Sequence, residues 1–176
     1  MFRQPYSSRV IPFHRNNLKN SLHLAAVDYD LGRNGIAYFD LDTANYSLPG
    51  SKRNIGNKGH IYRNDGVDIY KDSLRSKTFY VGSIEDGEWL QYTISVSNVG
   101  NYNFLFSITP GSDESKASLL INDEQRGEIN IKPSSGKGVW QSFPVKNIHL
   151  ASGTNRIKVL ATKGGYKFEA IDITKQ

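Results

Sequence analysis

The chain has 176 residues, a formal net charge of +5 and no cysteine. This length is enough to bury the hydrophobic core of one domain without covalent cross-links. The lack of cysteine excludes a disulfide framework, a thiolate metal site and a cysteine nucleophile. Because lysine and arginine are scattered rather than clustered, the charge does not indicate nucleic acid as a partner.

Residues 1–21 are polar and irregular, and we interpret them as a linker or as the lead-in to an edge strand. They lack the apolar segment of a signal peptide, and no apolar run in the chain approaches the ~18 residues needed to cross a bilayer. We therefore expect the folded module at residues 22–176, no membrane span, and a signal on a longer parent chain if the protein is exported.

The next part of the chain has few strand signals. Residues 22–29 and 35–39 are apolar and strand-like. Residues 40–77 are rich in Asn, Gly, Ser, Asp and Lys, and this composition predicts a long ordered loop. Because long loops in compact domains are usually functional or mobile, we expect this segment to shape a binding site.

Strand signals become regular farther along the chain. At residues 89–96 apolar and polar side chains alternate, as in an antiparallel strand with one buried face. Turns with Gly or Asx separate the segments, and the pattern predicts an all-β fold of two packed antiparallel sheets. The expected strands are residues 79–84, 88–96, 102–108, 117–121, 128–131, 141–145, 155–161 and 168–173.

The most specific motif lies at residues 81–92. Its letters, VGSIEDGEWLQY, resemble the V-G-x-I-x-x-G-[DE]-W-[LV]-x-Y signature of family 6 carbohydrate-binding modules. The resemblance covers about residues 22–173 and keeps the family order. The flanking matches are Tyr29-Asp30, residues 35–38 and 62–69 upstream, as in a subgroup with an extended first loop, and residues 138–143, 150–158 and 168–173 downstream.

This resemblance implies a jelly-roll β-sandwich that binds polysaccharide and is not an enzyme. It also implies a monomeric module, covalently linked to the catalytic domain of a glycoside hydrolase that works outside the cell, in the periplasm or at the cell surface. Family members carry a saccharide site in the loops at one end, and some carry a second site on the concave face of a sheet. Xylan, β-glucan, agar-type and sulfated galactan ligands all stay open.

Sugar rings stack on flat aromatic faces, and their hydroxyls need polar partners nearby. By the resemblance, Trp140 takes the position of the family's loop-end aromatic, with packing as the alternative role. Trp89, in the signature strand, corresponds to a core residue of the family, and we do not expect it to bind ligand. The main sugar-binding candidate is therefore Trp140.

The family's second aromatic falls on Ser83, so the usual pair of rings is incomplete in this sequence. We expect Tyr62, Tyr80 or Tyr38 to substitute for it, although ordinary packing is an equal alternative for each. Asp65 could accept hydrogen bonds from sugar hydroxyls, but an Asx residue before glycine is also typical of a turn.

The asparagine that the family carries near its last strand falls on Lys167 or Glu169. A lysine offers only donors on a positive centre, so Lys167 suggests a ligand that bears carboxylate or sulfate groups. The alternative is a solvated surface lysine. We include both positions among the expected sugar-binding residues.

The resemblance also implies a structural calcium, which requires several oxygen ligands. The two first-strand carboxylates of the family fall on Ala25 and Val27, and only Asp172 on the last strand remains. Asp28 is one position out of register, so its side chain is expected on the opposite face of the strand. We predict that the calcium site is weakened or absent and that no cofactor is required.

Two other functions stay open. The paired carboxylates of a glycosidase could come from Glu85, Asp86, Glu88, Asp113 and Glu114. Residues 85–88, however, are typical of a hairpin turn whose acids remain solvated. The sequence has no metal-like histidine spacing, G-x-S-x-G motif or phosphate-binding glycine loop. An adhesion or structural sandwich without sugar affinity is the other alternative, because a fold does not guarantee a function.

Overall fold

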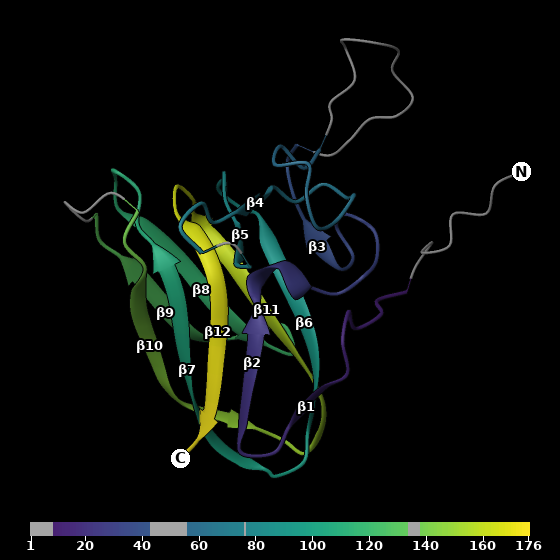
Figure 1. Cartoon of the computed structure of the whole chain (residues 1–176). Helices are drawn as coiled ribbons and strands as arrows, with labels where there is room; N and C mark the ends of the chain where they lie inside the picture. The colour runs from purple at the N-terminus through teal and green to yellow at the C-terminus, as the bar shows by residue number, and fades with distance from the viewer. Residues whose placement is uncertain (1–8, 43–55, 76, 134–137) are drawn as a thin grey trace, which may run out of the picture.

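The computed structural model describes residues 9–42, 56–75, 77–133 and 138–176 (Figure 1). The regular elements of these residues are strands and one short 3-10 helix, η1 (Ala26–Asp28), and none is a helix with the length and apolar character that a bilayer crossing requires. The strands are β1 (Asn16–Leu18), β2 (Ser21–Ala25), β3 (Tyr38–Phe39), β4 (Ile69–Lys71), β5 (Phe79–Val81), β6 (Trp89–Val96), β7 (Gly100–Thr109), β8 (Ser115–Ile121), β9 (Glu124–Ile131), β10 (Gln141–Leu150), β11 (Gly153–Lys163) and β12 (Lys167–Lys175).

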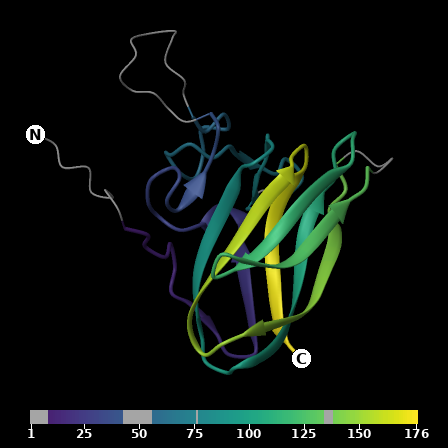
Figure 2. The same cartoon turned by 180° about the vertical axis from the view of Figure 1, so that it is seen from behind.

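Two sheets lie face to face (Figures 1 and 2). The first, which we call the β6 sheet, has the order β1-β6-β11-β8-β9, and β3 also pairs with β6. The second, the β12 sheet, has the order β10-β7-β12-β5-β4, and β2 also pairs with β12. The pairings are antiparallel apart from that of β1 with β6, which is parallel. The predicted all-β, two-sheet sandwich is confirmed.

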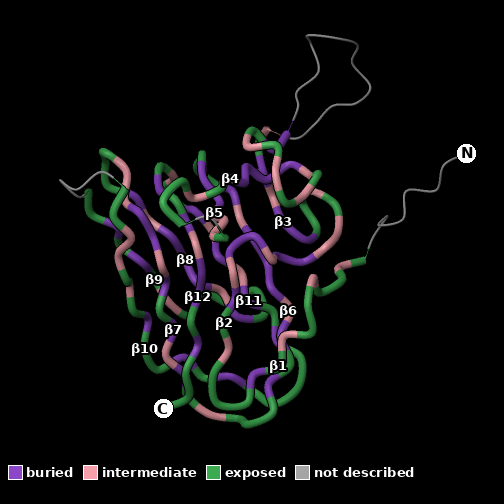
Figure 3. The backbone as a smooth tube through the Cα atoms, in the orientation of Figure 1, coloured by how far each residue is buried: buried purple, intermediate pink, exposed green. Residues whose placement is uncertain are grey.

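The period of two along each strand decides which side chains form the core (Figure 3). On β6 the even-numbered positions from 90 to 96 are buried, whereas Ser95 is exposed. Ile157 on β11 is fully buried beside them, and Phe104 and Phe106 of β7 join the same cluster from the other sheet. Burying each such side chain contributes about 1.5–3 kcal/mol relative to leaving it in water.

The polar lead-in contributes an edge strand to the sandwich. β1 pairs with residues 94–96 of β6, and the Leu18 side chain is fully buried. The packed structure therefore includes residues that precede position 22. Residues 1–8 of the lead-in lie outside the described residues.

The strand expected over residues 22–29 is shorter than predicted. It ends at Ala25, and the chain then turns into η1. The sheet hydrogen bonds stop there because side chains take the next carbonyls: the Tyr92 hydroxyl donates to the carbonyl oxygen of Ala26 at 2.8 Å. The strand expected at residues 35–39 is likewise reduced to the two residues of β3.

The segment predicted as a long loop, residues 40–77, is partly strand. Its β4 pairs with β5, so that Tyr70 lies opposite Tyr80 at the edge of the β12 sheet. Residues 43–55 and 76 of the predicted loop lie outside the described residues. The described part of residues 40–77 is therefore packed as part of the sandwich.

One buried amide organises this segment. Asn57 is 4% exposed, and its Nδ2 donates to the carbonyls of Ile61 and Arg63, each at 2.9 Å. Its Oδ1 accepts the backbone N–H groups of Gly59 at 3.1 Å and Ile69 at 3.0 Å. A single side chain thus satisfies backbone groups that no sheet or helix would pair.

A buried charge then attaches the segment to the sandwich. The Arg63 side chain is 5% exposed, and its Nε and Nη2 bind Asp65 Oδ2 at 3.0 and 2.9 Å. The same guanidinium donates to the carbonyl oxygens of Val27, Tyr29 and Asp30, at the end of β2 and η1. It also lies 3.5 Å from the centroid of the Tyr29 ring. A buried guanidinium is stable only when its donors are paired in this way.

Replacing Arg63 with alanine should therefore destabilise the fold strongly. We expect Arg63→Ala to lower the free energy of unfolding by about 3–5 kcal/mol, the range for breaking a buried ion pair. Urea denaturation measures this change. Arg126→Ala is the matched control, because Arg126 is half exposed and pairs with Glu124 at the surface, where a salt bridge contributes at most about 1 kcal/mol. Equal losses in both variants would contradict the anchoring role.

Candidate functional site

Three half-buried aromatic rings lie together at the end of the β12 sheet where β10 begins. The centroids of Tyr80 and Trp140 are 5.6 Å apart in a T-shaped contact, and those of Tyr70 and Tyr80 are 5.7 Å apart and stacked. We call these three residues the Trp140 cluster. Ser83, at the position of the family's second aromatic, lies 2.8 Å from the Tyr70 hydroxyl. Tyr70 therefore adds an aromatic ring beside the position where the sequence lacks one.

The loop between β4 and β5 holds the indole of Trp140 in place. Trp140 Nε1 donates to Asp72 Oδ2 at 3.2 Å, and Arg75 pairs with Asp72 at 2.8 Å and with Glu169 at 2.7 Å. The Arg75 guanidinium lies 5.3 Å from the Trp140 ring centroid. The backbone N–H of Leu74, together with Arg75 and Trp140, lowers the pKa of Asp72 to about 2. The carboxylate is thus ionised at every ordinary pH.

The structure brings four of the expected sugar-binding residues together. Lys167 Nζ lies 5.2 Å from the ring centroid of Tyr80. Glu169 reaches the Trp140 cluster through Arg75 and accepts a hydrogen bond from Ser107 at 2.6 Å. Flat rings, a carboxylate and an ammonium group share one surface, which is the combination that sugar rings and hydroxyls require. The four are Trp140, Tyr80, Lys167 and Glu169.

The other expected residues have different partners. The Tyr62 hydroxyl donates to Asp28 Oδ1 at 2.6 Å, and its ring contacts those of Phe13 and Phe79. Asp65 is bound by Arg63, so its carboxylate serves the buried charge. Tyr38 was a third substitute for the missing ring, but it lies in the core. Sequence spacing could not separate these internal roles from ligand binding.

Tyr70, Asp72 and Arg75 were not identified from the sequence. Asp72 and Arg75 lie in the part of the chain that was predicted to be loop. Three positions separate them, the spacing of an acid and a base within one turn, but nothing in the sequence indicates that this pair faces Trp140. That contact exists because the β4–β5 loop lies against the start of β10.

The expectation that Trp89 is a core residue is corrected by the structure. Trp89 is half-buried on the outer face of the β6 sheet, because its neighbour Leu90 points into the core. Lys158 Nζ lies 4.5 Å from the Trp89 ring centroid and 2.8 Å from Asp123 Oδ1. The sequence contained an indication of this position, because Trp89 is odd-numbered, like the polar residues of β6 such as Gln91, whereas the core residues of the strand are even-numbered.

Trp89 lies in a hollow of about 570 Å³ on this outer face. We call it the sheet-face hollow. A volume of this size is typical of ligand sites, which span about 300–1,000 Å³. Its polar lining includes Gln91, Thr93, Asn122, Asp123, Arg156 and Lys158.

A buried carboxylate fixes the floor of the sheet-face hollow. Asp30 is fully buried and accepts hydrogen bonds from Gln91 Nε2 at 3.2 Å, from the Thr93 backbone N–H at 2.9 Å and from the Thr93 hydroxyl at 2.7 Å. Burial raises the pKa of Asp30, whereas these donors lower it. The side chains of Gln91 and Thr93, which form the floor of the hollow, are therefore held in one orientation.

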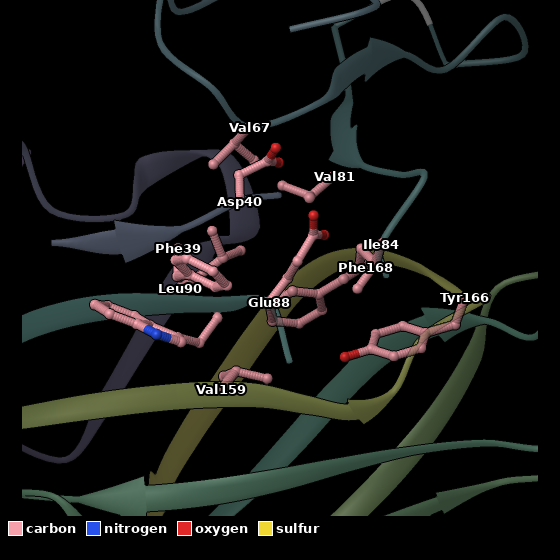
Figure 4. A pocket seen from close by; sticks show the side chains of 11 residues that line it. Phe39, Asp40, Val67, Val81, Ile84, Glu88, Leu90, Val159, Tyr166 and Phe168 are labelled. Carbon is pink, nitrogen blue, oxygen red and sulfur yellow. The ribbon is translucent and has the colours of Figure 1, made fainter. Parts of the chain in front are cut away.

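Two carboxylates, those of Asp40 and Glu88, line a small, mostly apolar cavity (Figure 4). Glu88 accepts the backbone N–H groups of Leu41 at 3.0 Å and Glu85 at 2.9 Å. Burial, followed by the charge of Glu88, raises the pKa of Asp40 to about 7. The cavity volume is about 20 Å³, enough for about one water molecule. These carboxylates cannot contact a sugar ring inside the cavity.

The raised pKa of Asp40 predicts a pH-dependent stability. The folded-state pKa of about 7 lies above the ordinary value of 3.8, so this contribution is complete below the ordinary value and is lost as the pH rises through the folded value. We expect the free energy of unfolding, measured in urea at about pH 4, 6 and 8, to fall as the pH rises. In Asp40→Asn the fall should be smaller, and an unchanged slope would exclude Asp40 as its source.

The residues at the family's calcium positions do not fit the ion. Ala25 and Val27 provide no side-chain oxygen, and Ala25 pairs with Ala170. Asp172 lies opposite His23, and its Oδ1 is 2.7 Å from the His23 Nδ1. The part of the chain that the structure describes contains no group of three or more His, Cys, Asp or Glu side chains placed to hold a metal ion. The carbonyl oxygens of Val27 and Asp30, close to these positions, accept hydrogen bonds from the guanidinium of Arg63.

We accordingly predict that stability is independent of calcium. The midpoint of thermal unfolding should agree to within about 1 °C in EDTA and in excess calcium, because an ion that binds only the folded state would raise it. Differential scanning calorimetry measures the midpoint. An increase of several degrees with calcium would show that other ligands complete a site.

Comparison with known proteins assigns the class and then the family. The fold is that of carbohydrate-binding β-sandwiches: the C-terminal family 6 module of LamC, a laminarinase of Zobellia galactanivorans, superimposes with a TM-score of 0.62 at 19% identity, over 89% of this chain and all of that one. A family 6 module of Clostridium stercorarium solved with cellobiose gives 0.63 at 10% identity, over 93% and 98%. The family described as carbohydrate binding module (family 6) matches residues 60–175. The chain belongs to this family of non-catalytic modules.

Two curated relatives share sequence with this chain. It is 26% identical over 132 residues to the β-agarase AgaO of Microbulbifer thermotolerans, covering 70% of this chain and 11% of the relative. It is 29% identical over 132 residues to the α-agarase of Thalassotalea agarivorans, covering 68% and 8%. The chain thus spans about a tenth of the length of these relatives.

Proposed function

We propose that this module targets an attached glycoside hydrolase to an agar-type galactan and that the Trp140 cluster is its main sugar-binding surface. The observation that carries the proposal is the group of three half-buried rings beside paired charged side chains. Such rings retain exposed surface on which a sugar can stack, and the neighbouring polar atoms can bind its hydroxyls.

The contacts of Trp140 support binding by a preformed surface. Its indole is held by Asp72, and Asp72 is in turn held by Arg75. Immobilising a side chain during binding costs about 0.5–1.5 kcal/mol, and a ring that is already fixed avoids this cost. Lys167 and Glu169 then supply a donor and an acceptor beside Tyr80 and Trp140.

The choice of ligand rests on the two curated relatives, which are both agarases. Lys167 beside Tyr80 would give a sulfated galactan an electrostatic partner that a neutral agarose chain does not use. The parent protein would be an exported hydrolase, and the module would act outside the cell, in the periplasm or at the cell surface, as a monomer.

The sheet-face hollow is a second candidate surface. Its single tryptophan, Trp89, lies beside the oriented side chains of Gln91 and Thr93. This combination meets the same chemical requirement as the Trp140 cluster, on the opposite sheet of the sandwich. We propose that it binds the same polymer.

Affinity electrophoresis tests these assignments. Agarose should retard the unmodified protein more than xylan, mixed-linkage β-glucan or laminarin, and a sulfated galactan in the same series tests the role of Lys167. Trp140→Ala should lower the affinity derived from the retardation by about tenfold, which corresponds to a loss of about 1.4 kcal/mol of binding free energy. Trp89→Ala should weaken it to a smaller extent if both surfaces bind.

His149→Ala is the matched control, because His149 carries an exposed ring on β10 outside both proposed surfaces. Its retardation should equal that of the unmodified protein. An equal loss in His149→Ala and Trp140→Ala would contradict the placement of the site. Absence of retardation by every polymer would favour an adhesion or structural module without sugar affinity.

A further inference from the structure

A second hollow adjoins the sheet-face hollow along β6. Its volume is about 440 Å³, and its lining consists of residues 11–17, residues 93–95 and Thr154. Thr93 and Thr154 line both hollows. The two spaces therefore meet above the same pair of strands, β6 and β11, and together form one groove.

The groove is longer than either hollow alone. Its floor follows β6 from Trp89 to Ser95, a distance of about 20 Å at about 3.3 Å per residue. This length spans several sugar units of an extended polysaccharide. The hydroxyl groups of Thr93, Ser95 and Thr154 continue the polar surface beyond Trp89.

Residues 11–17 form one side of this extension, and we call them the N-terminal wall. The wall is held at its start, where Ile11 and Leu31 exchange backbone hydrogen bonds of 2.9 and 2.7 Å. It is held at its end, where Asn16 Nδ2 donates to the carbonyl of Thr93 at 3.2 Å and β1 pairs with β6. Fixed ends give the wall a defined position relative to the floor.

The middle of the wall is fixed by side chains. His14 Nε2 lies 3.5 Å from Asp28 Oδ2, and the Phe13 ring lies 5.1 Å from the Arg63 guanidinium. His14 and Arg15 nevertheless remain exposed. The wall thus combines anchored side chains with polar groups that are free to contact a ligand at its exposed edge.

We propose that the N-terminal wall is a specificity element that extends the sheet-face hollow into a groove for a long stretch of agar-type polysaccharide. The proposal rests on the proposed function, because it assumes that the sheet-face hollow binds this polymer. Short oligosaccharides occupy the part around Trp89. Longer ones also contact the wall, so affinity at this surface increases with chain length.

Isothermal titration with agar oligosaccharides, from disaccharide to octasaccharide, tests the proposal. Trp140→Ala provides the background in which only the sheet-face surface binds. We expect affinity to increase about tenfold, or 1.4 kcal/mol, from tetrasaccharide to octasaccharide. Adding His14→Ala and Arg15→Ala should remove most of this increase and leave the tetrasaccharide affinity unchanged. His149→Ala with Lys146→Ala, two exposed residues of β10, is the matched control.

A measurement on the unmodified chain tests the proposal even if the variants fail to fold. In amide NMR spectra, the octasaccharide should shift the signals of Asn17 and Ser95, which line only the second hollow, whereas the tetrasaccharide should not. Unchanged length dependence in the wall variant, equal losses at every length, or no shift at these amides would each overturn the proposal.

The remaining outcomes separate this proposal from the proposed function. If the unmodified chain binds but Trp140→Ala binds no oligosaccharide, the groove is not a site, and the function of the Trp140 cluster stands. If the unmodified chain binds no agar oligosaccharide of any length, the proposed ligand is wrong, and the proposal for the wall is overturned with it.

Discussion

A guanidinium removed from water needs an acceptor for each of its donors, and in this protein that requirement determines how the first loop meets the sandwich. Arg63 gathers the carbonyl oxygens of Tyr29 and Asp30 with a carboxylate from its own loop. Once the backbone of Asp30 is placed there, its side chain binds Gln91 and Thr93 on β6. The buried charge is therefore linked, through two further contacts, to the floor of the sheet-face hollow.

The two tryptophans are presented in a similar way on opposite sheets. Arg75 lies against the ring of Trp140, and Lys158 lies against that of Trp89. A carboxylate binds each cation, so each ring has a donor and an acceptor within its immediate surroundings. Cation–π contacts of this kind stabilise by about 0.5–1 kcal/mol at exposed sites. They also fix polar atoms beside each ring.

Much of the fold could be predicted from the alternation of apolar and polar residues. The strands after residue 78 were located correctly because each has one buried face, and the even positions of β6 are its core face. The same alternation indicates that Trp89 lies outside the core, whereas the family signature predicts a core residue at this position. β1 was not identified as a strand because three residues, of which only Leu18 is buried, carry too little periodic signal.

The sequence by itself determined the family and the two-sheet sandwich, because these depend on local order, spacing and period, and it predicted Trp140 as the main sugar-binding candidate. Only the tertiary structure decided which side chains accompany that ring. Asp72 and Arg75 contact Trp140 across more than sixty positions of sequence, whereas Asp65 binds the buried guanidinium of Arg63. Such contacts form where strands and loops distant in the sequence meet in space, and no local pattern in a single sequence indicates which of them will meet.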